Sequence, residues 1–224
     1  MNWPTVPRLG GPGGWRSVWI MLLAWVLAGA AQAGGPKDPF DLARPHVRLY
    51  GTETGLPSGT VYNLARDPSG HLWAATQEGA ARFDGLAWTP VTPPSAKGPC
   101  RGILPLADGT LWLGFETGGL WRQKENQWTS FEPTMGINQV FESRVVQPSL
   151  WATTRGKGLL RWTGGQWVPA GLAGQWVWKL SECLGPDGRM RLWAGGRGGL
   201  WVWEDRDWKR VGKDQRFLDD ANAV

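Results

Sequence analysis

The chain has 224 residues, of which 42% are hydrophobic and 19% are charged, and its formal net charge is +5. Leaving out Arg8 and Arg16, the only charged residues before position 34, lowers this charge to +3. So small and scattered an excess of positive charge argues against a nucleic-acid-binding protein. The 18 tryptophans and 33 glycines instead direct attention to a repeated structural pattern.

Residues 1–33 have the layout of a secretory signal peptide. They contain two arginines and no acidic residue, continue with an apolar run at 18–28, and end in Ala31-Gln32-Ala33. This order is typical of a signal removed after Ala33, and the apolar run is short for a membrane span, although an uncleaved anchor is the alternative. We therefore expect a signal peptide at 1–33, a lead-in segment at 34–46 and an exported, periplasmic protein whose membrane attachment lies outside this chain.

A pattern of about 40 residues then occurs four times. Each copy has a first tryptophan, a glycine six or seven residues later, and a second tryptophan nine residues after that glycine. The first tryptophans are Trp73, Trp112, Trp151 and Trp193, the glycines are Gly79, Gly119, Gly158 and Gly199, and the second tryptophans are Trp88, Trp128, Trp167 and Trp208. A constant period of this length predicts small sheets that must stack on their neighbours to bury their faces.

Within residues 60–91 the first copy contains four short strand-like segments separated by turn residues. The sequence therefore predicts an all-β propeller over 47–211, with about four blades of four antiparallel strands. The expected blades are 55–91, 98–132, 137–170 and 174–211. The repeated tryptophans are expected to pack these blades against one another. In the third copy Pro148 replaces the usual turn signal, so a different turn is expected there.

The segment from Gly55 to Val91 resembles the two-component regulator propeller repeat. The resemblance rests on Gly55-Leu56-Pro57, Leu72-Trp73 and Arg82-Phe83, and the later copies keep only the tryptophan and glycine skeleton. That family is known for periplasmic sensor regions of bacterial signalling proteins. The resemblance implies a sensory, ligand-binding and non-catalytic module that is coupled to an output domain, a histidine kinase or a diguanylate cyclase, beyond the chain end.

The two ends of the repeated region predict an incomplete ring. Val47-Arg48-Leu49-Tyr50 lies 41 residues before Trp88-Thr89-Pro90-Val91 and is expected to form an outermost strand. Residues 212–224 resemble the opening of a further repeat. We therefore expect part of a larger ring of six to eight blades, with a closed four-bladed ring and a loose tail as the alternative.

The sequence offers little catalytic chemistry. His46 and His71 have no evident partners for acid–base work, and no metalloprotease, CxxC or phosphate-binding motif occurs. Cys100 and Cys183 are interpreted as buried apolar residues that do not pair with each other. We expect no catalytic residue, no cofactor and no metal. An exported propeller enzyme of the lyase or lactonase type, or a protein-binding scaffold, remains the alternative.

The loops between the second and third strands of the copies should lie on one rim. Arg155, Lys157 and Arg197 make part of this rim basic, which favours an anionic ligand such as a uronate-bearing sugar; solvated loop charges are the alternative. Trp176 and Trp178 precede the expected first strand of the fourth copy and either stack on a sugar or partner or pack the blade. The expected partners are an extracytoplasmic ligand, a carbohydrate among the candidates, and a second copy of the full-length protein.

Overall fold

The structure is a computed structural model that describes residues 48–132, 135–146, 149–185 and 187–212. The chain divides into two compact units, Met1–Arg48 and Leu49–Val224, and all described residues except Arg48 belong to the second unit. The predicted signal peptide at 1–33 and lead-in segment at 34–46 lie outside the described residues. The predicted further repeat at 212–224 also lies outside them, apart from Gly212.

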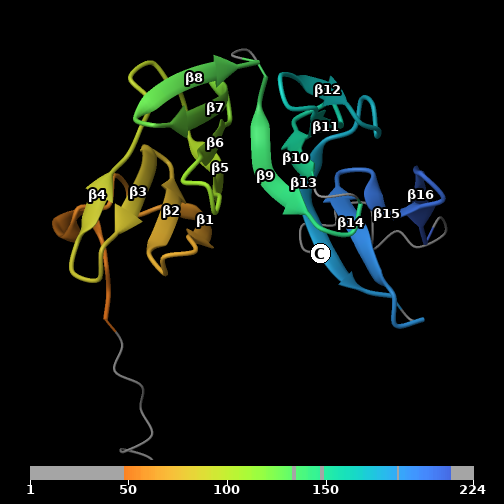
Figure 1. Ribbon diagram of the computed structural model, residues 1–224, viewed down its shortest axis with the longest axis horizontal. Helices are drawn as coiled ribbons and strands as arrows, with labels where there is room; N and C mark the ends of the chain where they lie inside the picture. Colours follow the sequence, from red (N-terminus) through yellow and green to blue (C-terminus); the bar gives the residue numbers. More distant parts are fainter. Residues whose placement is uncertain (1–47, 133–134, 147–148, 186, 213–224) are drawn as a thin grey trace, which may run out of the picture. The chain divides into compact units, whose positions relative to one another are not determined.

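The described strands form four antiparallel sheets, and each sheet consists of four strands that follow one another in the chain (Figure 1). The first sheet contains β1 (Val61–Arg66), β2 (Leu72–Thr76), β3 (Gly79–Phe83) and β4 (Trp88–Pro90). The second contains β5 (Cys100–Pro105), β6 (Leu111–Phe115), β7 (Gly119–Lys124) and β8 (Gln127–Phe131).

The third and fourth sheets repeat this order. The third sheet contains β9 (Ile137–Ser143), β10 (Ser149–Thr154), β11 (Leu159–Trp162) and β12 (Trp167–Pro169). The fourth contains β13 (Val177–Leu184), β14 (Met190–Gly196), β15 (Gly199–Glu204) and β16 (Asp207–Val211). The β9–β10 turn, where Pro148 predicted a departure, includes residues 147–148, which lie outside the described residues.

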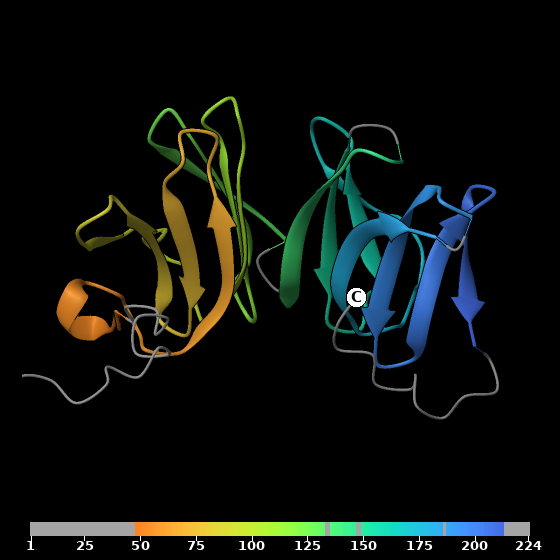
Figure 2. The ribbon, with the colours of Figure 1, turned by 90° about the horizontal axis from the view of Figure 1, so that it is seen from below.

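The first strands of successive sheets lie beside one another. Strand β1 contacts β5, β5 contacts β9, and β9 contacts β13. In Figure 2 the antiparallel strands of the fourth sheet, coloured blue, lie side by side. This arrangement is that of propeller blades, whose first strands are innermost. The predicted all-β propeller fold with four-stranded antiparallel blades is confirmed.

Each pair of consecutive sheets encloses a hydrophobic core. Between the second and third sheets, Trp112 and Leu120 pack against Ile137 and Val140. The ring of Trp112 also lies among the rings of Phe131, Trp162 and Trp167, with centroid distances of 5.1–5.5 Å. Equivalent cores join the first sheet to the second and the third to the fourth. No sheet buries both of its faces alone, so the stability of the array depends on its inter-sheet contacts.

The structure places the repeated tryptophans on these faces. The buried ones are Trp73, Trp88, Trp112, Trp151 and Trp167, and the half-buried ones are Trp128, Trp193 and Trp208. All four repeated glycines have positive φ angles, from 71° to 126°. A Cβ at Gly119 would lie 2.1 Å from the Glu132 carbonyl oxygen. Glycine thus recurs at this position because other residues are strained there and lack space.

Two predictions are wrong. Residues 48–50, the described part of the strand predicted at 47–50, belong to no strand. Tyr50 nevertheless packs edge-on against Phe83, with ring centroids 5.0 Å apart. Cys183 is exposed, because it lies near the hairpin end of the long strand β13, whereas Cys100 is buried as expected. Both cysteines are free, and burial raises the pKa of the Cys100 thiol well above its ordinary value.

Candidate ligand-binding site

The first strand of every sheet contains a β-bulge near its start. The pairing register shifts between Val61 and Asn63 in β1, and the same shift recurs at the corresponding places in β5, β9 and β13. The extra residues are Tyr62, Arg101, Asn138 and Trp178. A bulge bends its strand and redirects one side chain, and such features are frequent beside functional sites.

These bulges surround a pocket of about 330 Å³. Its lining consists mainly of polar side chains from the four first strands, together with one residue from the loop after β10. The lining residues are Tyr62, Asn63, Arg101, Asn138, Gln139, Arg155, Trp178 and Lys179. The volume falls within the range of small-ligand sites, and each sheet of the array contributes to the wall.

A three-residue ion cluster joins the second and third sheets at this pocket. Nε of Arg101 and Nη1 of Arg155 donate hydrogen bonds to the two carboxylate oxygens of Glu116, which lies just after β6. The Glu116 side chain is only 19% exposed. Burial by itself raises the pKa of this carboxyl, but the hydrogen bonds and charges of the two arginines outweigh that effect and hold the pKa below its ordinary value of 4.5.

Aromatic rings flank both arginines. The guanidinium carbon of Arg101 lies 4.2 Å from the ring centroid of Tyr62, and that of Arg155 lies 5.1 Å from Trp176. Both distances are those of cation–π contacts. A continuous series of contacts therefore runs from the first sheet through Glu116 to the residue that precedes the fourth sheet.

Amide side chains in the pocket join the third sheet to the fourth. The Gln139 side chain donates to the carbonyl oxygen of Leu180 and accepts a hydrogen bond from its N–H. Nδ2 of Asn138 donates to the Val177 carbonyl oxygen at 2.8 Å, which leaves its oxygen as an acceptor. Among the described residues the Asn63 side chain has no hydrogen-bond partner. Gln139 therefore has a structural role, whereas Asn63 and the Asn138 oxygen are available to a ligand.

The predicted ligand residues separate into two groups. Arg155 and Trp178 line the pocket, and Trp176 lies against Arg155. Trp178 lies within β13 as its bulged residue, not before the strand as the sequence predicted. Lys157 lies in the same loop as Arg155, and Arg197 lies in the corresponding loop of the fourth sheet. Both are exposed and do not line this pocket.

Sequence reasoning missed most of the pocket lining. The missed residues are Tyr62, Asn63, Arg101, Asn138, Gln139 and Lys179. A signal was present in the last three copies. Apolar residues at the start of the first strand, such as Cys100 and Ile103, are three positions apart, whereas regular alternation places them two apart. This break in alternation recurs in each of these copies, as a bulge at a constant place requires.

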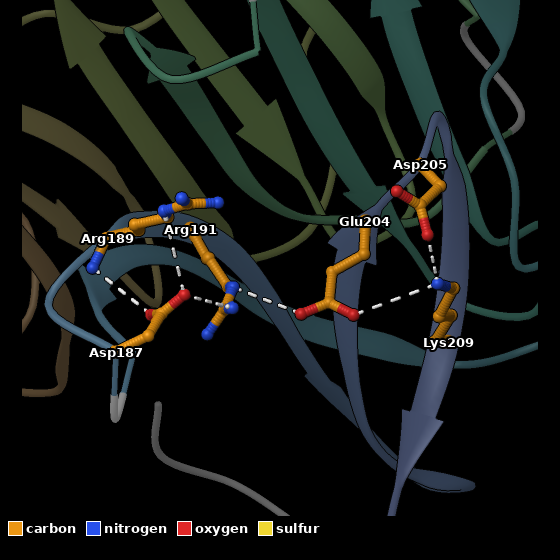
Figure 3. Close-up of polar contacts among 6 residues, drawn as sticks. All are labelled: Asp187, Arg189, Arg191, Glu204, Asp205 and Lys209. Carbon is orange, nitrogen blue, oxygen red and sulfur yellow. Dashed lines mark hydrogen bonds and ion pairs between the residues drawn. The ribbon is translucent and has the colours of Figure 1, made fainter.

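A second charged cluster lies in the fourth sheet, near the β13–β14 and β15–β16 hairpins (Figure 3). Arg191 bridges Asp187 and Glu204 at 2.8 and 3.0 Å, and Lys209 pairs with Glu204 and Asp205. Arg189 also faces Asp187, at 3.9 Å. Three cations balance three anions in this cluster, so it has no excess charge with which to attract a charged ligand.

His71 belongs to a local cluster of the first sheet. Its Nδ1 lies 3.4 Å from Asp67 and 3.0 Å from Nη2 of Arg82, and Asp67 also accepts a hydrogen bond from Nε1 of Trp73. These contacts orient the Trp73 ring.

Within the part of the chain that the structure describes, no group of three or more acidic, histidine or cysteine residues is arranged to hold a metal ion. No helix there is long and apolar enough to cross a membrane.

The consecutive antiparallel sheets and their adjacent first strands place the protein in the class of β-propellers. Residues 55–78, which include β1 and β2, match the family described as two component regulator propeller. No curated protein sequence matches the chain.

Solved structures share the fold. The extracellular domain of a hybrid two component system from B. thetaiotaomicron is 21% identical with a TM-score of 0.58, and the match covers 74% of this chain and 26% of that one. The extracellular domain of a one component system from the same organism is 17% identical with a TM-score of 0.58, over 79% and 24% of the two chains. Virginiamycin B lyase from Staphylococcus aureus is 13% identical with a TM-score of 0.52, over 72% and 58%.

The chain thus spans about a quarter of the length of the two sensor domains. At these identities the likeness shows the fold alone, and it includes both sensor domains and a lyase. Function has to be argued from the site.

Proposed function

We propose that the chain is part of the periplasmic sensory propeller of a bacterial signal-transduction protein, which binds an extracytoplasmic ligand at the bulges of its first strands. The pocket carries this proposal, since it combines a suitable volume with aromatic, amide and cationic side chains from all four sheets. The two component regulator propeller repeat at 55–78 supports it. The sensor-domain structures that share the fold make an extracytoplasmic location reasonable.

The contacts in the pocket suggest how binding changes the protein. Arg101 joins the first and second sheets through Tyr62, and Glu116 joins the second and third through Arg155. A ligand that binds these side chains more tightly in one arrangement of the sheets than in another shifts the protein toward the arrangement it prefers. In this proposal the module is non-catalytic and transmits the change to an output domain beyond residue 224, a histidine kinase or a diguanylate cyclase, in a membrane-attached and dimeric full-length protein.

Ligand binding is tested by isothermal titration calorimetry of the full chain with a panel of mono- and disaccharides. At least one sugar is expected to bind, and Trp178→Ala should weaken it tenfold or more, because this substitution removes the stacking surface in the pocket. Arg197→Gln is the matched control, since Arg197 is an exposed rim residue outside the lining. Binding that Trp178→Ala leaves unchanged would contradict this site.

The signalling part of the proposal is tested by the gene sequence beyond codon 224. Further repeats followed by a membrane span and a kinase or cyclase domain are expected. A stop codon directly after codon 224 would contradict coupling to an output domain and would leave an exported binding protein.

A further inference from the structure

We infer that the ligand of the bulge pocket is an acidic saccharide whose carboxylate lies beside Arg101, Arg155 and Lys179. This inference rests on the proposed ligand-binding function and names the chemical class of the ligand. It rests on the net positive charge of the pocket, on its unused hydrogen-bond donors, and on its ring surfaces and volume.

The charge of the pocket is unbalanced. Three of its lining residues, Arg101, Arg155 and Lys179, are cationic, and none is acidic. Glu116 supplies one negative charge to the two arginines, and the Lys179 side chain has no ion-pair partner among the described residues. A positive excess in a concave site draws anions and is not neutralised by the protein itself.

Hydrogen-bond donors remain unused at the same place. Arg101 engages Glu116 through Nε, so its terminal nitrogens are available to another acceptor. Nε of Arg155 is buried and has no hydrogen-bond partner among the described residues. A buried donor without a partner costs free energy, and an oxygen of the ligand would relieve that cost. A carboxylate suits such donors because its hydrogen bonds to guanidinium groups are charge-assisted.

The other lining residues suit a sugar. Trp178 and Tyr62 offer ring surfaces, and Asn63 and the Asn138 oxygen offer an amide and an acceptor for hydroxyl groups. About 330 Å³ is enough for one or two sugar rings. A small inorganic anion would use the cations and leave the amides and rings without a role.

The experiment compares two ligands by calorimetric titration of the full chain: a galacturonic acid disaccharide and the neutral galactose disaccharide. The acidic disaccharide is expected to bind at least tenfold more tightly. Lys179→Gln should weaken its binding about fivefold and weaken binding of the neutral disaccharide by a smaller factor, while the control Arg197→Gln should change neither. Lys179 is exposed, so its replacement does not disturb the core.

Glu116→Gln separates a binding role from a structural one. Removal of the internal carboxylate leaves two arginine charges free, so binding of the acidic disaccharide is expected to become tighter, about threefold or more. A substitution that merely loosened the pocket would weaken both ligands. Circular dichroism checks that the variant is folded.

The outcomes distinguish this inference from the proposed function. Equal affinity for both disaccharides with no effect of Lys179→Gln would overturn the acidic class and leave saccharide binding intact. No binding of either disaccharide would overturn this inference. The proposed function fails if the whole sugar panel also fails to bind, or if Trp178→Ala leaves sugar binding unchanged.

Discussion

Two clusters of charged side chains in this protein have similar chemistry and different surroundings. In the fourth sheet, Asp187, Arg191 and Glu204 belong to a balanced network at the hairpin ends (Figure 3). At the bulges, Glu116 lies between Arg101 and Arg155, beside a pocket that adds a third cation. The cluster in the fourth sheet balances its own charges, whereas the cluster at the bulges has more cations than anions and a buried hydrogen-bond donor without a partner.

The comparison shows that the presence of charges does not identify a site. Exposed ion pairs contribute little, because solvent screens them and their long side chains lose entropy when they pair. A partly buried cluster with excess charge is different, since its imbalance persists in the folded protein until a ligand or ion compensates it. The excess positive charge, the low exposure of Glu116 and the buried, unpartnered Nε of Arg155 therefore mark the bulges as the candidate site.

The largest expected effect comes from damage to the hydrophobic core between the two sheets that the Glu116 cluster joins. Trp112→Ala removes the ring that packs between the second and third sheets, the two sheets that the Glu116 cluster joins. We expect a loss of about 3–5 kcal/mol in the free energy of unfolding, measured by urea denaturation. Trp176→Ala is the control, because Trp176 is exposed. Equal losses in the two variants would contradict the assignment of the inter-sheet core.

Removal of the shared carboxylate should have the next largest effect. Glu116→Ala leaves Arg101 and Arg155 partly buried without their anion. Because the two arginines are partly exposed, the expected loss in the free energy of unfolding is only about 1–3 kcal/mol, measured by urea denaturation. If high salt alone lowered the free energy of unfolding of the wild type by the same amount, the cluster would be behaving as an ordinary surface ion pair.

The pH dependence of stability should report the same carboxylate. Because the pKa of Glu116 is lower in the folded protein than its ordinary value of 4.5, its contribution is fully present above that value and is lost as the pH falls through the folded pKa. The stability difference between wild type and Glu116→Gln is therefore expected to shrink below pH 4.5. Urea denaturation of both proteins from pH 3 to 7 measures it, and a difference that stays constant over this range would exclude the ion cluster as its source.

The balanced cluster should show the smallest effect. Glu204→Ala removes the acceptor between Arg191 and Lys209, whose side chains are 23% and 49% exposed. We expect a change of about 0.2–1 kcal/mol in the free energy of unfolding and no change in ligand binding. An effect as large as that of Glu116→Ala would remove the distinction between the two clusters.

Much of the fold could be predicted from the sequence because its determinants repeat. A tryptophan such as Trp112 and a glycine such as Gly119 recur at a constant period, and each has one physical reason to be there: a buried inter-sheet face or a positive φ angle. The strand predicted at 47–50 is not observed at 48–50, because sequence similarity to Trp88–Val91 does not by itself determine strand pairing.

The site was less predictable because its residues vary from copy to copy. Tyr62, Arg101, Asn138 and Trp178 occupy one repeated position and differ in size, charge and polarity. They share this position because each is the extra residue of a bulge. A bulge changes the direction of a side chain and requires no particular residue type. The loop position of Arg155 could be predicted from the sequence. Its pairing with Glu116 could not, because that contact depends on how two sheets pack together.

Ligand binding at the bulges of the first strands can be tested without any substitution. The measurement is amide hydrogen exchange, followed by mass spectrometry with and without the galacturonic acid disaccharide. Binding at the bulges should slow exchange at the starts of β1, β5, β9 and β13, with no change at the opposite hairpins, residues 67–71 and 106–110. Protection at those hairpins, or at the ion network of the fourth sheet in place of the bulges, would contradict it.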